Sequence, residues 1–225
     1  MYDLTVKALR AIFDLSIKTP AILPAETYFP NASRFLEKYA DIQKQVMALN
    51  RRNMPLFHHL MPEQAAISAL DGRDWKLFVL KAYGTTIESN LSLLPTLKQL
   101  LADHPEVLSA AISVLAPRKV IPKHKGPFRG ILRFHMIIRC GWNDAGEAVS
   151  TLIIDGKAYQ LSDGQVLLWD DTYDHEAFND SDEDRIALLL DVWRTGMPLH
   201  LRILARVIVR LVGTSVTLFK RPTIE

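Results

Sequence analysis

Short runs of β-forming residues, separated by turn residues, fill the second half of this chain and constrain its fold more than any other feature. The runs are rich in Val, Ile and Leu, and Pro, Gly or Asp-Gly pairs stand between them. They cover residues 111–115, 131–140, 147–154, 165–169, 175–178 and 185–193. Strands at such close intervals predict an antiparallel sandwich or barrel and argue against alternating βαβ units.

Helical patterns precede this region. Apolar residues recur three and four positions apart over residues 4–17 and 32–49, and a further helix is expected over 91–102. Residues 75–80 are expected to form the first strand, and residues 56–62 a separate apolar loop. We therefore predict an α+β fold with a mainly β core and N-terminal helices.

The length and composition fit one domain of generous size. With 225 residues and 48% hydrophobic residues, the chain can bury a substantial core without disulfides. The patterns divide it into a helical lead-in over residues 1–74, a β core over 75–198 and a C-terminal segment over 199–225.

The C-terminal segment is locally basic. Residues 194–225 have a net charge of +5, and the rest of the chain has −3, which argues against a general nucleic-acid binder. Arg202, Arg206 and Arg210 recur every four residues among aliphatic residues, which predicts a basic amphipathic helix. Such a helix either lies in an anionic membrane interface, through residues 199–221, or packs on the core with solvated arginines.

The expected compartment is the cytoplasm, with contact at the inner face of the membrane as an option. No secretory signal is evident, and no run approaches the roughly 18 apolar residues of a membrane span. Cys140 is the single cysteine, which excludes an internal disulfide and suits a reducing compartment. It follows a strand-like run, so we expect a small buried residue.

Two histidines and an arginine form the most informative polar pattern. His124 and His175 on neighbouring strands can hold one divalent metal, and Arg185, one strand further on, can clamp a dicarboxylate beside it. Arg133 and His135 alternate along one strand and therefore face the same side. A non-haem iron oxygenase needs such a combination.

Two observations keep the alternatives open. Gly126 stands where the usual carboxylate ligand would follow the first histidine, so either two histidines and water hold the metal or the site is not an iron site. A lone strand histidine is more often a hydrogen-bonded structural residue. The nearby acids Asp170, Asp171 and Asp174 are expected to orient an imidazole through its second nitrogen.

Several blocks of the chain resemble the aspartyl/asparaginyl β-hydroxylase family. They are PKHKGP at 122–127, LRFH at 132–135, WDDTYDHE at 169–176, Arg185, and DVW at 191–193. The resemblance covers residues 75–198 and is densest over 110–195. It implies a double-stranded β-helix (jelly-roll or cupin-like) and a dioxygenase that depends on Fe(II), 2-oxoglutarate and O2, with ascorbate as an aid.

The resemblance also implies a role for individual residues. His124 and His175 would be the metal ligands, and Gly126 fits, because the family lacks the usual carboxylate. Arg185 would pair with the distal carboxylate of 2-oxoglutarate, and Ser113 would hydrogen-bond it. Arg133 and His135 would contact the carboxylate end nearer the metal.

The substrate is less constrained. Relatives with this core act on aspartyl or asparaginyl residues, on lipid acyl chains and on small metabolites. The first 70 residues are too few for the helical repeats of the protein-hydroxylating members, so we expect an acyl or small carboxylate-bearing substrate. A peptidyl Asp/Asn β-hydroxylase is the alternative in the same class. A non-catalytic cupin-like binding module and a membrane-tethered scaffold are the alternatives in another.

Overall fold

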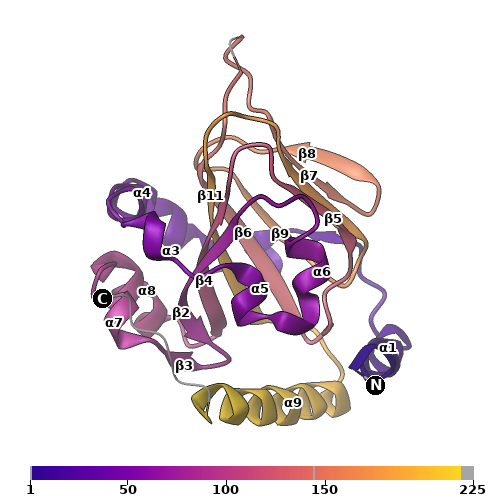
Figure 1. Ribbon diagram of the computed structural model, residues 1–225. Coiled ribbons are helices and arrows are strands. Elements are labelled where there is room, and N and C mark those ends of the chain that lie inside the picture. Colours follow the sequence, from indigo (N-terminus) through magenta and orange to yellow (C-terminus); the bar gives the residue numbers. More distant parts are fainter. Residues whose placement is uncertain (1, 144, 219–225) are drawn as a thin grey trace.

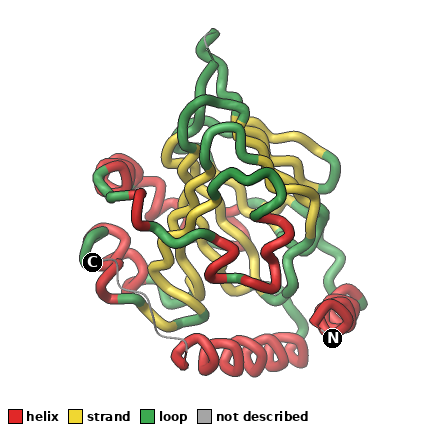
Figure 2. Tube along the Cα trace, in the orientation of Figure 1, coloured by secondary structure: helices red, strands yellow, loops and turns green. Residues whose placement is uncertain are grey.

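The computed structural model describes residues 2–143 and 145–218. Within them, the strands form a seven-stranded and a four-stranded antiparallel sheet that face each other, and helices cover the outside of the larger one (Figures 1 and 2). The larger sheet has the order β1-β9-β6-β11-β4-β2-β3 and the smaller one the order β5-β10-β7-β8.

The chain alternates between the two sheets. The larger sheet contains β1 (Ile22–Leu23), β2 (Trp75–Ala82), β3 (Thr85–Thr86), β4 (Val107–Leu115), β6 (Ile131–Arg139), β9 (Val166–Trp169) and β11 (Arg185–Trp193). The smaller sheet contains β5 (Val120–His124), β7 (Ser150–Ile154), β8 (Lys157–Gln160) and β10 (His175–Asn179). From β4 onward each crossing brings the chain to the other sheet, except at the β7–β8 hairpin. This order of strands is the predicted double-stranded β-helix.

Four strands lie outside the predicted runs: the two-residue strands β1 and β3, and the longer strands β5 and β8. β8 follows β7 through the turn Asp155-Gly156, where both residues have positive φ (50° and 76°), as a tight hairpin turn requires. β5 contains Pro122 and occupies the edge of its sheet, where a missing backbone N–H leaves no partner strand unpaired.

The N-terminal region is helical but more broken than its periodicity predicts. It contains α1 (Tyr2–Asp14), α2 (Ala25–Tyr28), α3 (Ala32–Glu37), α4 (Tyr39–Met47), α5 (Phe57–Leu60) and α6 (Ala65–Ser68), with short 3-10 turns at Arg51–Asn53 and Pro62–Gln64. The predicted helix over 32–49 is interrupted at Lys38, from which α4 crosses to the end of β6. The prediction of a loop over 56–62 was wrong, because Phe57 begins a helical turn and stacks on Trp75.

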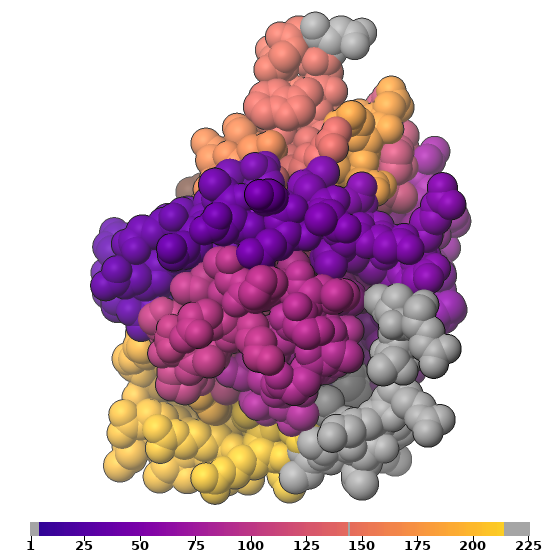
Figure 3. Space-filling model, turned by 90° about the vertical axis from the view of Figure 1, so that its left-hand side faces the viewer, coloured from indigo at the N-terminus to yellow at the C-terminus, as the bar shows by residue number. Residues whose placement is uncertain are grey.

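The helix predicted over 91–102 is two helices, α7 (Glu88–Leu91) and α8 (Pro95–Asp103). Pro95 cannot occupy a helix interior but fits a first turn, so the second helix begins at it. Figure 3 shows α3 and α4 above α7 and α8 on one side of the molecule, with α9 (Leu199–Leu218) along its lower edge.

The main core joins the helical lead-in to the larger sheet. Phe29 and Phe35 of the lead-in pack against Phe134 of β6 with ring centroids 5.5 and 6.2 Å apart. A second core cluster joins Phe13 of α1 to Leu201 of α9. The boundaries at 74/75 and 198/199 therefore stay predictions, because shared cores join the three segments.

Cys140 is completely buried, as predicted. The C-terminal helix is present as α9, and Arg202, Arg206 and Arg210 are all exposed. Residues 219–225 of the predicted basic segment lie outside the described part of the chain. None of the described helices combines the length and apolar character needed to cross a bilayer.

Candidate functional site

The two predicted ligand histidines lie side by side between neighbouring strands. His124 ends β5, His175 begins β10, and the two residues are partners in the antiparallel register, with ring centroids 4.0 Å apart. Each Nδ1 lies at hydrogen-bond distance from the carbonyl oxygen two residues earlier, that of Pro122 (2.8 Å) and that of Tyr173 (2.9 Å). When Nδ1–H donates to these carbonyls, both Nε2 atoms keep a lone pair for a metal.

Burial keeps both rings neutral, as metal ligands must be. It lowers the pKa of His124 and, with the neighbouring His124, lowers the pKa of His175 to about 3. The prediction that an aspartate orients an imidazole was wrong, because these backbone carbonyls do so. Asp174 is exposed and lies 3.7 Å from Lys125, and Asp170 belongs to a different network.

Asp171 fills the space beside Gly126. A Cβ atom added to Gly126 would lie 2.2 Å from Asp171 Oδ1, and the amide of Gly126 donates to the carbonyl oxygen of Asp171 at 2.6 Å. Burial raises the pKa of the Asp171 carboxyl to about 6. Even so, within the described residues no group of three His, Cys, Asp or Glu side chains could hold a metal. The described residues therefore bring two imidazoles together without a third side chain of a type that binds metals beside them.

Arg133 is held by two acids at the edge of the site. Its guanidinium donates to Asp191 Oδ1 at 2.9 and 3.0 Å and lies 3.3 Å from Asp171 Oδ2. Burial works against its charge, but Asp191 and Asp171 raise its pKa. Its charge is thus largely compensated within the protein, although its side chain keeps 27% of its surface exposed.

Arg185 is the opposite case. It is only 2% exposed, its Nε has no hydrogen-bond partner, and no carboxylate of the described residues forms an ion pair with it. Its Nη2 lies 3.4 Å from Nε2 of His135. Burial lowers the pKa of Arg185 to about 10 and holds the pKa of His135 well below 6.5. A buried cation without a counter-ion is costly unless an anion joins it.

Ser113 lies on the same face as Arg185. It pairs with Ala187 across β4 and β11, one alternation from the Arg185–Leu115 pair. The indole Nε1 of Trp75 donates to its oxygen at 3.0 Å. That bond leaves the Ser113 hydroxyl proton available for an acceptor in the cavity.

One cavity connects all of these groups. It holds about 500 Å³ of empty space, including its open mouth. The predicted residues His124, His175, Arg133, His135, Arg185 and Ser113 all line it. The walls between them are mostly apolar, and they come from Leu115, Ile121, Leu152, Ala177, Ala187 and Leu189. The six predicted residues thus lie together in one cavity, and their roles stay proposals.

Two tryptophans of the cavity escaped the sequence prediction. Trp75 was expected only as the start of a strand, yet it orients Ser113. Trp169 contacts the His175 ring edge-on at 4.6 Å, and its buried Nε1 has no hydrogen-bond partner among the described residues. A single chain offers no local signal for either contact, because each joins strands that are distant in sequence.

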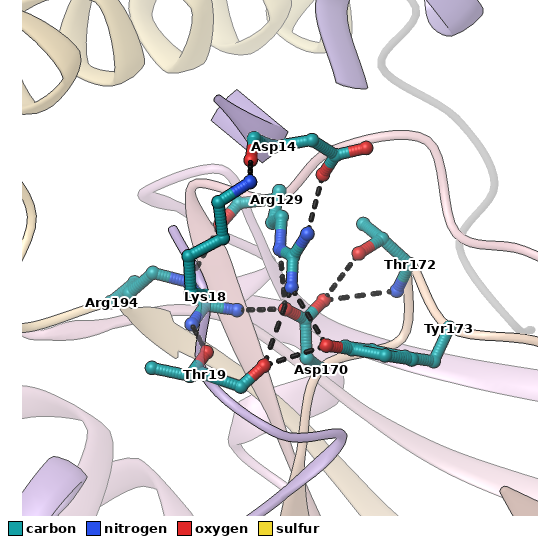
Figure 4. Close-up of polar contacts among 8 residues, drawn as sticks. All are labelled: Asp14, Lys18, Thr19, Arg129, Asp170, Thr172, Tyr173 and Arg194. Carbon is teal, nitrogen blue, oxygen red and sulfur yellow. Dashed lines mark hydrogen bonds and ion pairs between the residues drawn. The ribbon is translucent and has the colours of Figure 1, made fainter. Parts of the chain in front are cut away.

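A buried ionic network supports the segment that leads to His175 (Figure 4). Asp170 accepts hydrogen bonds from Arg129 (3.0 Å), from Arg194 and from the Thr172 hydroxyl (2.6 Å). The hydroxyl of Tyr173 donates to the carbonyl oxygen of Thr19 at 2.6 Å. The network fixes residues 170–173, and with them the Tyr173 carbonyl that orients His175.

Comparison with known proteins bears on this site. The family model described as "Aspartyl/Asparaginyl beta-hydroxylase" matches residues 36–195, about 40 residues further toward the N-terminus than the resemblance predicted. The chain is 30% identical over 166 residues to "Ornithine lipid ester-linked acyl 2-hydroxylase" of Rhizobium tropici, covering 72% of this chain and 57% of that protein. It is 27% identical to "Aspartate beta-hydroxylase domain-containing protein 2" of Xenopus tropicalis, covering 81% and 52%. The chain thus spans about half the length of these relatives.

Solved structures match parts of the chain. KdgF from Halomonas sp. has a TM-score of 0.35 and 11% identity, and the match covers 54% of this chain and 81% of that one. A predicted oxalate decarboxylase from Thermotoga maritima has a TM-score of 0.33 and 21% identity, with 41% and 71% covered.

Proposed function

Because the chain belongs to the aspartyl/asparaginyl β-hydroxylase family, we propose that it is an Fe(II)- and 2-oxoglutarate-dependent dioxygenase. Its substrate in this proposal carries an acyl chain or is a small carboxylate-bearing molecule. The observation that carries the proposal is the buried guanidinium of Arg185, which has no acidic partner among the described residues and lies in the cavity that also holds His124 and His175. A cation in this position matches a dicarboxylate cosubstrate.

The donor set fits the metal. Two neutral imidazoles with free Nε2 atoms suit iron, and a site without a carboxylate ligand leaves several positions for cosubstrate, dioxygen and water. When bound, the iron supplies the oxidation in which 2-oxoglutarate and O2 become succinate and CO2 while one oxygen atom enters a substrate C–H bond. The protein contributes position and environment.

The residues around the cavity have separable tasks. Arg185 and the hydroxyl of Ser113 would hold the far carboxylate of 2-oxoglutarate. Neutral His135 and the acid-paired Arg133 would face its other end. The aliphatic walls keep water away from the reacting centre, which protects the oxidising chemistry from side reactions.

The acyl substrate is favoured by the Rhizobium tropici relative, which is named for hydroxylation of a lipid acyl chain. A peptidyl Asp/Asn β-hydroxylase remains the alternative in the same class, since a human protein named "Aspartyl/asparaginyl beta-hydroxylase" is 25% identical over 181 residues. We place the reaction in the cytoplasm, where a chain with one buried cysteine needs no disulfide.

The test is succinate formation from 2-oxoglutarate with Fe(II), ascorbate and oxygen. Wild type, His175→Ala and the control His59→Ala, whose imidazole is exposed and outside the cavity, are compared with acyl-lipid and peptide substrates. We expect iron-dependent succinate that is lost only in His175→Ala. If no substrate supports turnover and the metal-loaded protein also fails to bind 2-oxoglutarate, the oxygenase proposal is wrong and a binding module replaces it.

A further inference from the structure

The outer face of α9 carries two parallel stripes. Arg202, Arg206 and Arg210 form the basic stripe, and the residue after each arginine belongs to the aliphatic stripe. The aliphatic stripe consists of Leu199, Ile203, Val207 and Leu211, which are 61%, 54%, 48% and 66% exposed. The opposite side of the helix is buried in the second core cluster through Leu201, Ala205 and Val209. The stripes therefore form the exposed side of the helix, opposite the side that is buried in the second core cluster.

α1 extends this surface. α1 and α9 lie at the same end of the molecule (Figures 1 and 2), and both pack into the second core cluster. Ile12 is 46% exposed and Leu15, just after the helix, is 79% exposed. We call the α9 stripes together with Ile12 and Leu15 the terminal face.

The terminal face combines positive charge with exposed aliphatic side chains, and this combination indicates what kind of partner it binds. Single exposed aliphatic residues are ordinary on a protein surface, but a continuous stripe beside a row of arginines is not. Residues 199–218 include no acidic residue, so no carboxylate of α9 offsets the charge of its three arginines. An anionic bilayer presents both complements at once, phosphate groups at the surface and an acyl layer just beneath. Arginines reach the phosphates while the neighbouring aliphatic side chains enter the acyl layer.

The terminal face also belongs to the end of the barrel that holds the metal donors. Phe128, in the loop that follows His124, packs edge-on against Phe13 of α1 at 5.4 Å and shares a core cluster with Leu201 of α9. One residue further, Arg129 donates to Asp14 at the end of α1 and to Asp170 (Figure 4). Both terminal helices are therefore fastened to the loops that carry the candidate ligands.

We propose that the terminal face docks the protein on an anionic lipid bilayer, with α9 lying along the interface. This places the metal end of the barrel at the membrane, where an acyl chain can pass from lipid to cavity. The docking itself needs no turnover, whereas the lipid acyl substrate rests on the proposed function.

Sedimentation with vesicles tests the docking. The full chain is mixed with vesicles of phosphatidylcholine alone or with part of it replaced by phosphatidylglycerol. We expect strong binding only to the anionic vesicles, weakening as salt is raised. Each arginine at an anionic surface strengthens binding about fivefold, so Arg202→Gln with Arg206→Gln should weaken binding to anionic vesicles about 30-fold. Ile203→Ser with Val207→Ser should weaken it at least tenfold, because two aliphatic side chains no longer enter the acyl layer.

Matched variants control for charge and hydrophobicity. Lys38→Gln with Lys157→Gln removes the same charge from exposed positions elsewhere, and Leu70→Ser with Leu93→Ser removes aliphatic side chains that are 71% and 55% exposed. Both control proteins should bind vesicles as the wild type does. Equal losses in the control and terminal-face variants, or no anionic preference in the wild type, would overturn the docking proposal.

The remaining outcome is self-association. If light scattering shows a dimer that Ile203→Ser with Val207→Ser dissociates, and vesicles bind none of the proteins, the terminal face joins two copies of this chain and the membrane proposal is wrong. Binding of 2-oxoglutarate to the Mn(II)-loaded protein in solution is measured on the same variants. It stays at the wild-type level if only docking is lost, so failure of the docking proposal is distinguishable from failure of the proposed function.

Discussion

Replacing Arg185 by methionine separates a ligand-binding role from a structural one. Methionine keeps much of the length and volume of the side chain but removes the charge. A structural arginine would have partners that the substitution breaks, which costs several kcal/mol. Arg185 has no acidic partner among the described residues, and its Nε is unpaired. We therefore expect the variant to be more stable than wild type when no ligand is present.

The magnitude follows from the pKa of Arg185. Burial lowers this pKa from 12.5 to about 10, which corresponds to about 3 kcal/mol against the charged form. At pH 7 the arginine is charged in the folded and the unfolded chain, so the whole penalty opposes folding. The lost contact with His135 costs about 1 kcal/mol. The free energy of unfolding of Arg185→Met should therefore exceed that of wild type by about 2 kcal/mol. For a chain of this size the gain is about 4 to 8 °C in Tm.

Two measurements on the same protein test this reasoning. Thermal unfolding without ligand should show the higher Tm, and calorimetric titration of the Mn(II)-loaded protein should show 2-oxoglutarate binding weakened at least 100-fold. The control is Arg139→Met on the adjacent strand, whose guanidinium forms an exposed pair with Glu183 and should leave both quantities near wild type. A lower Tm with unchanged 2-oxoglutarate affinity in Arg185→Met would refute the argument.

Three further predictions concern other buried groups. Asp71→Asn leaves the fully buried Lys119 without its carboxylate and should lower the free energy of unfolding by about 3 kcal/mol at pH 7. Burial raises the pKa of Asp71, but its hydrogen bonds with Lys119 and with backbone amides outweigh burial and lower the pKa below 3.8. In urea titrations, the difference in free energy of unfolding between wild type and Asp71→Asn should therefore be complete above pH 3.8 and shrink below it. Gly126→Ala places a methyl group against Asp171 and should cost about 1–3 kcal/mol, of which a second change, Asp171→Ala, recovers part; unchanged stability in the single variant would show that Asp171 moves freely. Burial raises the pKa of Cys140 to about 12, so Ellman's reagent should label it at pH 8 only in denaturant, and rapid labelling of the folded protein would contradict its burial.

Most of the longer strands were predictable because each of them is a local apolar run. The failures have local causes as well. β5 lay outside the predicted runs although an edge strand tolerates its Pro122, and β8 lay outside them because its residues are too polar to form an apolar run. The broken helices arose where packing, at Lys38, or proline, at Pro95, overrides a continuous apolar period.

In the candidate site, too, some features were predictable from the sequence and others were not. The family resemblance identified the six polar or charged residues that were predicted for the cavity, but not its two tryptophans or its aliphatic walls. The sequence could not show how His175 is oriented, because its partner is the Tyr173 carbonyl and not an acidic side chain. Nor could it show that Arg133 is paired and Arg185 is not. Pairing depends on which strands become neighbours, and it decides which arginine is left for a ligand.

That difference between the two arginines organises the electrostatics of the whole site. Arg133 with Asp171 and Asp191 carries one net negative charge when both acids are ionised, whereas Arg185 carries one positive charge and has no counter-ion among the described residues. Under the proposed function, a divalent iron and Arg185 supply three positive charges, and the dianion 2-oxoglutarate with the Arg133 group supplies three negative ones. The loaded cavity is neutral, while metal or dianion alone leaves it charged in an apolar enclosure, which is unfavourable. In this proposal, Asp171 beside Gly126 would supply the negative charge of the missing carboxylate without being a metal ligand.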